Sequence, residues 1–196
     1  MKKTILLIII MIVGFNANLS AQENQIINRI SEGSKDAKIT IITYESLTCG
    51  HCADFHKNVY PELKKNFIDK GLVRIEFRHF PLDIAAFNAS KIGQCNNDGK
   101  SDIIHILYSG QKKWAKGKTP EEATTNLKSF LIDKKVNVDF KKCLSNKDIE
   151  DYVLNDRIEG VKKFKVNATP TIIINDKKFD KALNYKNLKK YLEKLI

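Results

Sequence analysis

The sequence is poor in the residues that mark the unusual protein classes. Its 196 residues include 4 prolines and 9 glycines, too few for a collagen-like fibre, and 4 cysteines, too few for a disulfide-knotted miniprotein. The apolar fraction of 42% excludes a disordered tail. No internal repeat and no low-complexity segment interrupts the chain. The length therefore fits one good-sized domain, with or without a large insertion.

Acidic residues are in the minority. The 34 lysines and arginines face 23 aspartates and glutamates, which gives a formal net charge of +11. A basic balance is one mark of nucleic-acid-binding proteins. Here the lysines are spread along the expected helices and turns, without a run of five or more. We therefore expect a solvated basic surface and no nucleic-acid partner.

Long hydrophobic stretches are also missing, except for one at the N-terminus. Lys2 and Lys3 precede an apolar run over residues 5–15, and the small residue Ala21 follows at a plausible cleavage point. Eleven apolar residues span about 16 Å as a helix, roughly half of the hydrocarbon thickness of a bilayer. The pattern predicts a secretory signal peptide over residues 1–21 and export to the periplasm. The alternative is an uncleaved membrane anchor.

The rest of the chain suggests a small α/β unit interrupted by helices. Residues 38–44 and 72–78 have the composition of strands, and between them apolar residues recur every four positions, as on a helix packed against a core, with a kink expected at Pro61. Residues 83–159 show no comparable strand signal and are expected to be helical, with one helix over 120–133. A loop and a buried strand over 166–175 and an amphipathic helix over 185–195 end the chain.

Cys49 and Cys52 lie three residues apart where the first strand gives way to a helix. The first turn of a helix has unpaired N–H groups and partial positive charge, so a thiolate at Cys49 is stabilised and its pKa falls. A protonated His51 would add to this effect. Such a disulfide is easily reduced and oxidises other thiols, with Cys49 forming the mixed disulfide and Cys52 resolving it. The alternatives are a purely structural disulfide and a zinc site made of Cys49, Cys52, His51 and His56.

The second cysteine pair, Cys95 and Cys143, lies inside the helical region, with both residues flanked by polar ones. In an oxidising compartment we expect a structural disulfide between them, and a loop of this length would stabilise the fold by roughly 4 kcal/mol. Two buried free thiols are the alternative.

Together, several segments give the sequence a family resemblance. The first strand, Cys49-Gly50-His51-Cys52, Phe55 on the following helix and the late segment Ala168-Thr169-Pro170-Thr171 resemble the thioredoxin superfamily. The helical block between the two halves resembles the DsbA type of thiol:disulfide oxidoreductase, and residues 77–82 and 166–171 resemble alphaproteobacterial DsbA-like proteins.

The resemblance implies an α/β thioredoxin fold, with three layers, a central mixed sheet and a helical insertion. After the signal peptide, the expected parts are a leader (22–36), a first thioredoxin half (37–82), the helical insertion (83–159) and a second half (160–196).

The resemblance also implies roles for single residues. Cys49 is the nucleophile and Cys52 the resolving cysteine, while Pro170 is cis and lies against the sulfur of Cys49. Thr169 would offer backbone groups to an extended substrate chain. Family members often carry an acid six residues before the first cysteine and another four residues after the second. Here these positions are Thr43 and His56, which leaves open how Cys52 exchanges its proton; strand alternation need not turn Glu45 toward the pair.

The expected function is a periplasmic oxidase that donates the Cys49–Cys52 disulfide to newly exported cysteine-containing proteins. The alternatives are an isomerase or reductase that uses the same cysteines, and a non-catalytic chaperone or adhesion module on the same fold. By family analogy, a membrane quinone-linked partner reoxidises the protein. We expect a monomer that uses no cofactor and no metal.

Overall fold

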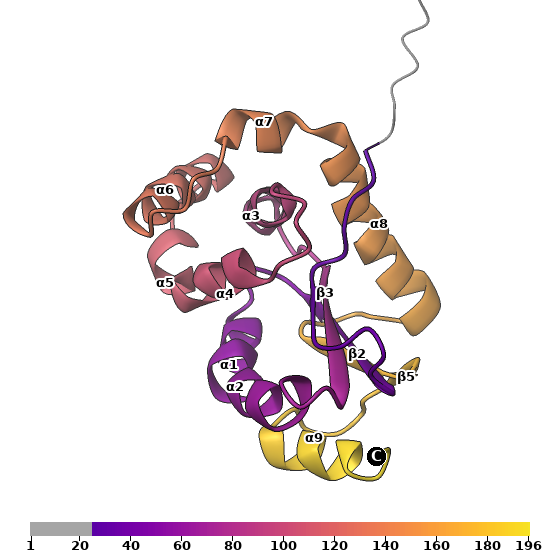
Figure 1. The fold of residues 1–196 in the computed structure, drawn as a ribbon. Helices are drawn as coiled ribbons and strands as arrows, with labels where there is room; N and C mark the ends of the chain where they lie inside the picture. Colours follow the sequence, from indigo (N-terminus) through magenta and orange to yellow (C-terminus); the bar gives the residue numbers. More distant parts are fainter. Residues whose placement is uncertain (1–24) are drawn as a thin grey trace, which may run out of the picture.

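The structure is a computed structural model and describes residues 25–196. The expected signal peptide, residues 1–21, lies outside the described residues. A mixed sheet with the strand order β1-β3-β2-β4-β5 forms the centre of the molecule (Figure 1). Only β2 and β3 are parallel to each other, and the remaining neighbours are antiparallel. The strands are β1 (Ser31–Glu32), β2 (Ile39–Glu45), β3 (Val73–His79), β4 (Thr171–Ile174) and β5 (Lys177–Lys178).

Helices connect the parallel strands, follow the last strand and fill the long segment between β3 and β4. They are α1 (Gly50–Asn58), α2 (Tyr60–Leu63), the π-helical turn η1 (Lys64–Ile68), α3 (Ile84–Gln94), α4 (Asp102–Ser109), α5 (Gln111–Trp114), α6 (Pro120–Asp133), α7 (Phe140–Ser145), α8 (Lys147–Phe164) and α9 (Tyr185–Leu192). The helix that follows β2 breaks at Val59, between α1 and α2 and just before Pro61, where a kink was predicted. None of the helices in residues 25–196 has the length and apolar character that a membrane span requires.

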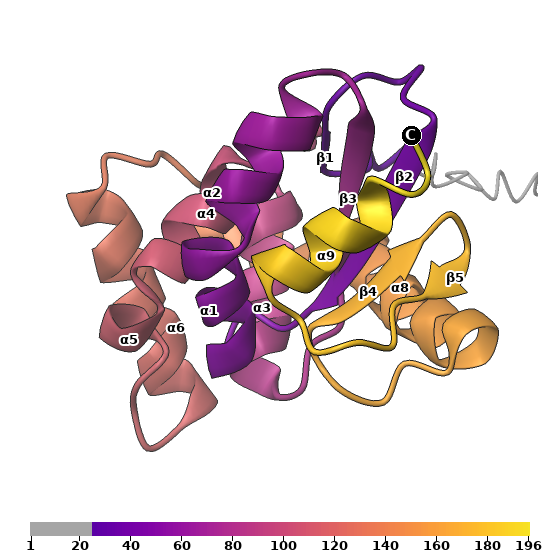
Figure 2. The same ribbon diagram turned by 90° about the horizontal axis from the view of Figure 1, so that it is seen from below.

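The two faces of the sheet bury different helices, because successive side chains of a strand point to opposite sides. Ile39 and Ile41 of β2 belong to the larger core, which also contains buried residues of α1, α4 and α9. Ile42 and Tyr44 point the other way and form a smaller core with Phe80 after β3, Phe164 and Val166 at the end of α8, and Ile173 of β4. Figure 2 shows α9 and α8 on opposite sides of the sheet. The sheet is thus the middle of three layers.

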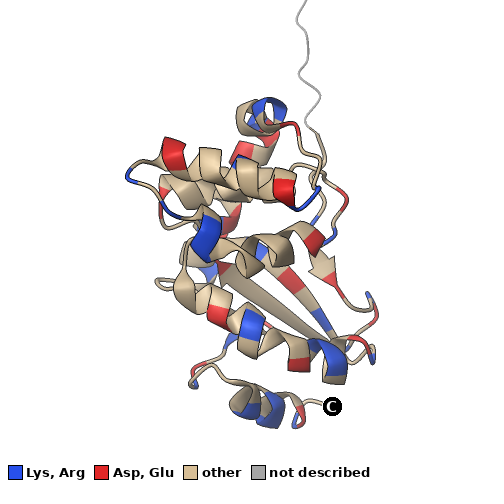
Figure 3. Cartoon of the chain, turned by 90° about the vertical axis from the view of Figure 1, so that its left-hand side faces the viewer, with Lys and Arg blue, Asp and Glu red and all other residues tan. Residues whose placement is uncertain are grey.

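The helical insertion packs beside this unit, with α3 surrounded by the other insertion helices (Figure 1). Its helix α6 has the bounds expected from the sequence, because Thr119 accepts a hydrogen bond from the N–H of Glu122 and Pro120 fills the first helical position. Cys95 at the end of α3 and Cys143 in α7 form a disulfide. On the side drawn in Figure 3, basic and acidic residues are interspersed along the helices.

Two features of individual elements do not follow from the sequence pattern. The leader over residues 22–36 contains β1, a strand too short to leave a periodic signal, which pairs with β3 at the edge of the sheet. In α8, the apolar residues Ile158 and Val161 are each 46% exposed. The buried side of α8 instead includes Asp156 and Gly160. Gly160 packs directly against the ring of Tyr44.

Candidate active site

Cys49 and Cys52 lie at the N-terminal end of α1, next to the end of strand β2. Cys49 is the N-cap residue, with extended backbone dihedral angles, and it has no side-chain cap. Its N–H donates to the carbonyl of Ser46, and the amide of Gln111 in α5 donates to the carbonyls of Leu47 and Cys49. The insertion therefore holds the loop that presents the first cysteine. Both cysteines are free thiols in this structure.

The first thiol is strongly acidic. The hydrogen bond from the Cys52 thiol is the main cause that lowers the pKa of Cys49 to about 5, and it outweighs partial burial. Thr169 and the backbone N–H groups of Cys52 and His51 add to the effect. These N–H groups belong to the first turn of α1, where a helix stabilises negative charge.

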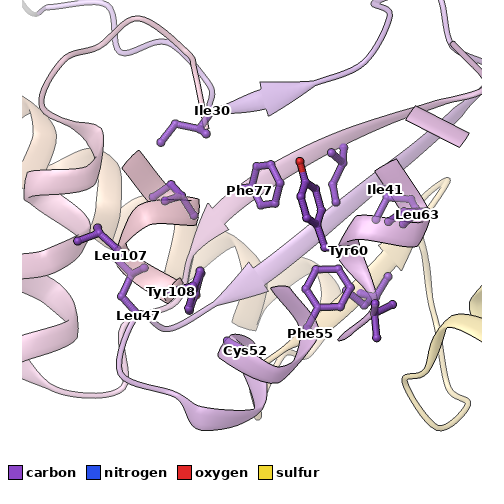
Figure 4. Packing of buried hydrophobic residues seen from close by; sticks show 14 of the residues in the cluster. Ile30, Ile41, Leu47, Cys52, Phe55, Tyr60, Leu63, Phe77, Leu107 and Tyr108 are labelled. Atoms are coloured by element: carbon purple, nitrogen blue, oxygen red, sulfur yellow. The ribbon is translucent and has the colours of Figure 1, made fainter. Parts of the chain in front are cut away.

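The second thiol has the opposite character. Cys52 has 0% exposure, and burial is the main cause that raises its pKa well above the ordinary value. The hydrogen bond to Cys49 and the negative charge of Glu45 raise it further. Figure 4 shows Cys52 at the edge of the buried cluster, below Tyr108 and beside Phe55. One sulfur of the pair is thus a partly exposed thiolate and the other a buried, neutral thiol.

The side chain of His51 lies on the exposed face of α1. Its imidazole is 88% exposed and is 4.0 Å from the carboxylate of Asp54, with which it shares the outer face of α1. The residue acts on Cys49 through its backbone N–H. The electrostatic role expected of the side chain stays a prediction.

The late segment lies beside the cysteines. The Thr169–Pro170 peptide bond is cis, and Cys49 Sγ lies 3.3 Å from the carbonyl oxygen of Thr169, to which it donates when it is protonated. Next to it is an open groove of about 500 Å³. The residues that line this groove include His51, Asp54, Thr169 and Pro170 near the cysteines and Leu183 and Tyr185 on the opposite side. An extended chain in this groove would lie beside Thr169, whose carbonyl oxygen is 3.3 Å from the sulfur of Cys49.

Glu45 and His56 form a buried contact that sequence reasoning did not anticipate. Glu45 is the last residue of β2 and lies on the same face as Ile41 and Thr43, so the strand does turn it toward α1. His56 Nε2 donates to Glu45 Oε2 at 2.7 Å, and both side chains are at most 5% exposed. Of the zinc ligand set considered above, His56 is thus engaged elsewhere. In residues 25–196, no three side chains of His, Cys, Asp or Glu gather as a metal site.

The comparisons with known proteins agree with this geometry. A family model described as thioredoxin matches residues 26–194. A Rickettsia bellii protein named "Putative protein-disulfide oxidoreductase" is 30% identical over 145 residues, or 73% of this chain and 55% of the relative. Disulfide bond formation protein D of Bacillus subtilis is 27% identical over 177 residues, or 83% of this chain and 74% of the relative. The chain thus spans about half the length of the Rickettsia relatives it matches.

Solved structures share most of the fold. Wolbachia pipientis alpha-DsbA1 superposes with a TM-score of 0.76 at 28% identity, covering 87% of this chain and 92% of that one. Oxidised BdbD from Bacillus subtilis superposes with a TM-score of 0.66 at 25% identity, covering 85% and 92%. The expected fold class, a mixed sheet with a helical insertion, is confirmed. The chain belongs to the thioredoxin superfamily and, within it, is DsbA-like.

Proposed function

We propose that this protein is a periplasmic thiol:disulfide oxidoreductase that donates the Cys49–Cys52 disulfide to exported, cysteine-containing proteins. The observation that carries the proposal is the contrast between the two sulfurs. Cys49 is stabilised as a thiolate, with a pKa of about 5, and Cys52 is buried. Stabilising the thiolate stabilises the reduced protein, and a couple whose reduced form is favoured is a strong oxidant.

The exchange proceeds in two steps. A substrate thiolate attacks Cys49 Sγ, the Cys49–Cys52 bond breaks, and Cys52 leaves and takes up one proton. A second substrate thiolate then attacks the substrate sulfur of the mixed disulfide, and Cys49 leaves as a thiolate. The substrate gains a disulfide and loses two protons, of which Cys52 keeps one. Cys49 leaves readily because a sulfur of low pKa is the better leaving group.

Binding and recycling complete the proposal. The groove beside Thr169 and Pro170 would hold the substrate as an extended chain, with the Thr169 backbone as one contact point. The reduced protein would return to the disulfide form through a membrane quinone-linked partner, as the family resemblance implies. Export through the signal peptide predicted over residues 1–21 would place the protein with its substrates.

Refolding of reduced, denatured ribonuclease in a glutathione buffer tests this function. We expect the wild-type protein to accelerate recovery of ribonuclease activity and Cys49→Ala to abolish the acceleration. Cys52→Ala should accumulate a mixed disulfide with the substrate, detectable by mass spectrometry. A preference for reduced over scrambled ribonuclease is expected of an oxidase. Equal activity of Cys49→Ala and the wild type would refute catalysis, and a preference for scrambled ribonuclease would point to an isomerase.

A further inference from the structure

A chain of hydrogen-bonded side chains leads from the buried cysteine toward the surface. It begins at Glu45 in β2, whose negative charge acts on Cys52. Glu45 Oε2 accepts from His56 Nε2 in α1, and His56 Nδ1 lies 3.1 Å from the Nδ1 atom of His105 in α4. His105 Nε2 then donates to Glu32 Oε1 in β1 at 2.7 Å. Two strands and two helices of different parts of the fold thus contribute one residue each.

The inner end of this path is buried and has a free acceptor. Glu45 is 5% exposed, and within residues 25–196 its Oε1 atom has no hydrogen-bond partner. A buried oxygen without a hydrogen-bond partner lowers the stability of the fold, so its presence needs an explanation, and a functional role is one. The outer end is more open, because the side chain of His105 is 27% exposed. The path therefore connects a buried carboxylate, whose charge acts on Cys52, with a histidine that reaches solvent.

The geometry fixes how many protons the path holds. When both carboxylates are ionised, His56 Nε2 and His105 Nε2 each carry a proton, because each donates to a carboxylate. The contact between the two Nδ1 atoms requires one further proton, since one nitrogen must donate and the other accept. The histidine pair then carries a single positive charge between two negative ones. Moving the shared proton toward His56 lets the Nε2 proton pass to Glu45.

The neighbouring titratable groups hold this arrangement in place and stay out of the transfer. Hydrogen bonds from His105, Ser101 and Tyr60 outweigh burial and lower the pKa of Glu32 to about 2, so it stays ionised. Burial raises the pKa of Tyr108, which stacks on His56, and of Tyr60, which stacks on His105. Both remain neutral.

Two further titratable groups lie near the ends of the path. Burial lowers the pKa of His79, the neighbour of Glu45 on β3, so this imidazole stays uncharged. Lys64 lies 3.8 Å from Glu32, and that carboxylate and Asp69 raise its pKa, so it remains a fixed cation.

We propose that Glu45, His56 and His105 form a relay that carries a proton between the buried thiol of Cys52 and solvent. The proposal rests on the proposed function, because Cys52 must take up a proton when the disulfide is donated and release it when the disulfide is restored. In the first direction the proton moves from His56 through Glu45 to the Cys52 thiolate, and His105 recovers one from water. When the disulfide is restored, the Cys52 thiol passes its proton to Glu45, Glu45 passes one to His56, and His105 releases one to water. The relay supplies the acid that is missing at Thr43, six residues before Cys49.

The reaction of the reduced protein with Ellman's reagent separates the two cysteines in time. In the first phase, the Cys49 thiolate attacks the reagent, forms a mixed disulfide and releases one thionitrobenzoate. In the second phase, Cys52 gives up its proton and attacks Cys49 Sγ, which closes the disulfide and releases a second thionitrobenzoate. Stopped-flow absorbance follows both phases. Only the second requires deprotonation of Cys52.

We expect Glu45→Gln and His56→Gln to leave the first phase unchanged and to slow the second about 100-fold, the scale of one acid–base group. The first phase is expected to be unaffected because neither side chain is among the main causes of the acidity of Cys49. Thr43→Val is the matched control, since it replaces a buried polar residue of the same strand by one of the same shape. Both phases of this variant should match the wild type.

The sign of the change separates a relay from simple electrostatics. The negative charge of Glu45 raises the pKa of Cys52, so an electrostatic role alone predicts that Glu45→Gln accelerates the second phase. A relay predicts the opposite. His105→Gln, at a more exposed site, should also slow the second phase. The double variant Glu45→Gln/His105→Gln should be no slower than Glu45→Gln, because both residues serve one path.

An unchanged or accelerated second phase in Glu45→Gln or His56→Gln, with a normal first phase, would overturn the relay. A loss of the first phase in these variants would overturn it as well, because it would place the two residues in the structure of the Cys49 site. Failure of the proposed function would look different. The two phases with Ellman's reagent would persist in the wild-type protein, while the refolding of reduced ribonuclease would not be accelerated.

Discussion

Two thiols three residues apart have opposite ionisation states because they face different surroundings. Cys49 receives hydrogen bonds from Cys52 and from the first turn of α1, whereas Cys52 is enclosed by the core and faces Glu45. The negative charge of the reduced pair is thus held on the partly exposed sulfur of Cys49 and not on the buried sulfur of Cys52. On the proposed function, this asymmetry makes Cys49 the sulfur that meets substrates and Cys52 the one that needs a partner for its proton.

The acidity of Cys49 gives a pH dependence with a definite sign. We expect its alkylation by iodoacetamide to be constant from pH 9 to pH 6 and to fall as the pH drops through about 5, because only the thiolate reacts. The contribution of the Cys49 thiolate to the stability of the reduced, folded protein depends on pH in the same direction. It is complete above the ordinary thiol pKa of 9.0 and is lost as the pH falls through about 5. Cys49→Ala supplies the background rate, and a midpoint near 9 would contradict the assignment.

At the residue scale, the sequence predicts the motif but not its surroundings. The spacing of Cys49 and Cys52 and their place before a helix indicate the chemistry without a structure. Glu32 and His105 carry no such signal, because β1 and α4 are far apart in the sequence and meet only in the fold. The electrostatic role expected of the His51 side chain stays a prediction, since its imidazole is largely exposed.

At the scale of elements, α8 ties the insertion to the sheet through a buried ion pair. Arg29 Nη1 donates to both carboxylate oxygens of Asp156 at 2.6 and 2.7 Å, and the N–H of His79 donates to the same carboxylate. Asp156 is 2% exposed. One side chain of α8 thus holds the end of β3 and the segment before β1.

Removing the carboxylate of Asp156 leaves the charge of Arg29 and the N–H group of His79 unpaired. We expect Asp156→Ala to lower the free energy of unfolding by about 3 kcal/mol, as is typical when one partner of a buried pair is lost. Glu159→Ala is the control on the same helix: Glu159 pairs with Arg78 but is 40% exposed, so its loss should cost about 1 kcal/mol or less. Urea unfolding measures both, and equal losses for the two variants would contradict the role given to Asp156.

Elements with a strong periodic signal are predictable from the sequence, and those fixed by tertiary contacts are not. Helix α6 begins and ends where Thr119, Pro120 and the apolar spacing place it. The two-residue strand β1 is too short for any periodicity and exists because β3 offers an unpaired edge. In α8, Asp156 lies on the same buried face as Ile149 and Val153, where it pairs with Arg29, while the apolar Ile158 lies outside that face.

At the scale of the whole molecule, the insertion has its own covalent link while it also supports the active site. The Cys95–Cys143 disulfide joins α3 to α7 over 48 residues of sequence. The same insertion provides Gln111, which holds the loop before Cys49, and His105, which contacts His56. The stability of the insertion is therefore coupled to the geometry of the catalytic pair.

The Cys95–Cys143 disulfide closes a loop of 48 residues and so restricts the unfolded chain. We expect Cys95→Ala/Cys143→Ala to lower the free energy of unfolding by about 4 kcal/mol on the chain-entropy account. The comparison is made by urea unfolding, with Cys49 and Cys52 reduced in both proteins under conditions that leave the second disulfide of the wild type intact. A loss below about 1 kcal/mol would show that the disulfide adds little to the fold.

The reduction potential of the Cys49–Cys52 couple tests the central claim most directly. The purified protein is equilibrated with glutathione buffers of graded composition, and the fraction of reduced Cys49 and Cys52 is counted by alkylation and mass spectrometry. A stabilised Cys49 thiolate predicts a potential of about −120 to −180 mV, the range between DsbA and protein disulfide isomerase. A potential near that of thioredoxin, about −270 mV, would contradict the oxidase, because the disulfide would then be too stable to be donated.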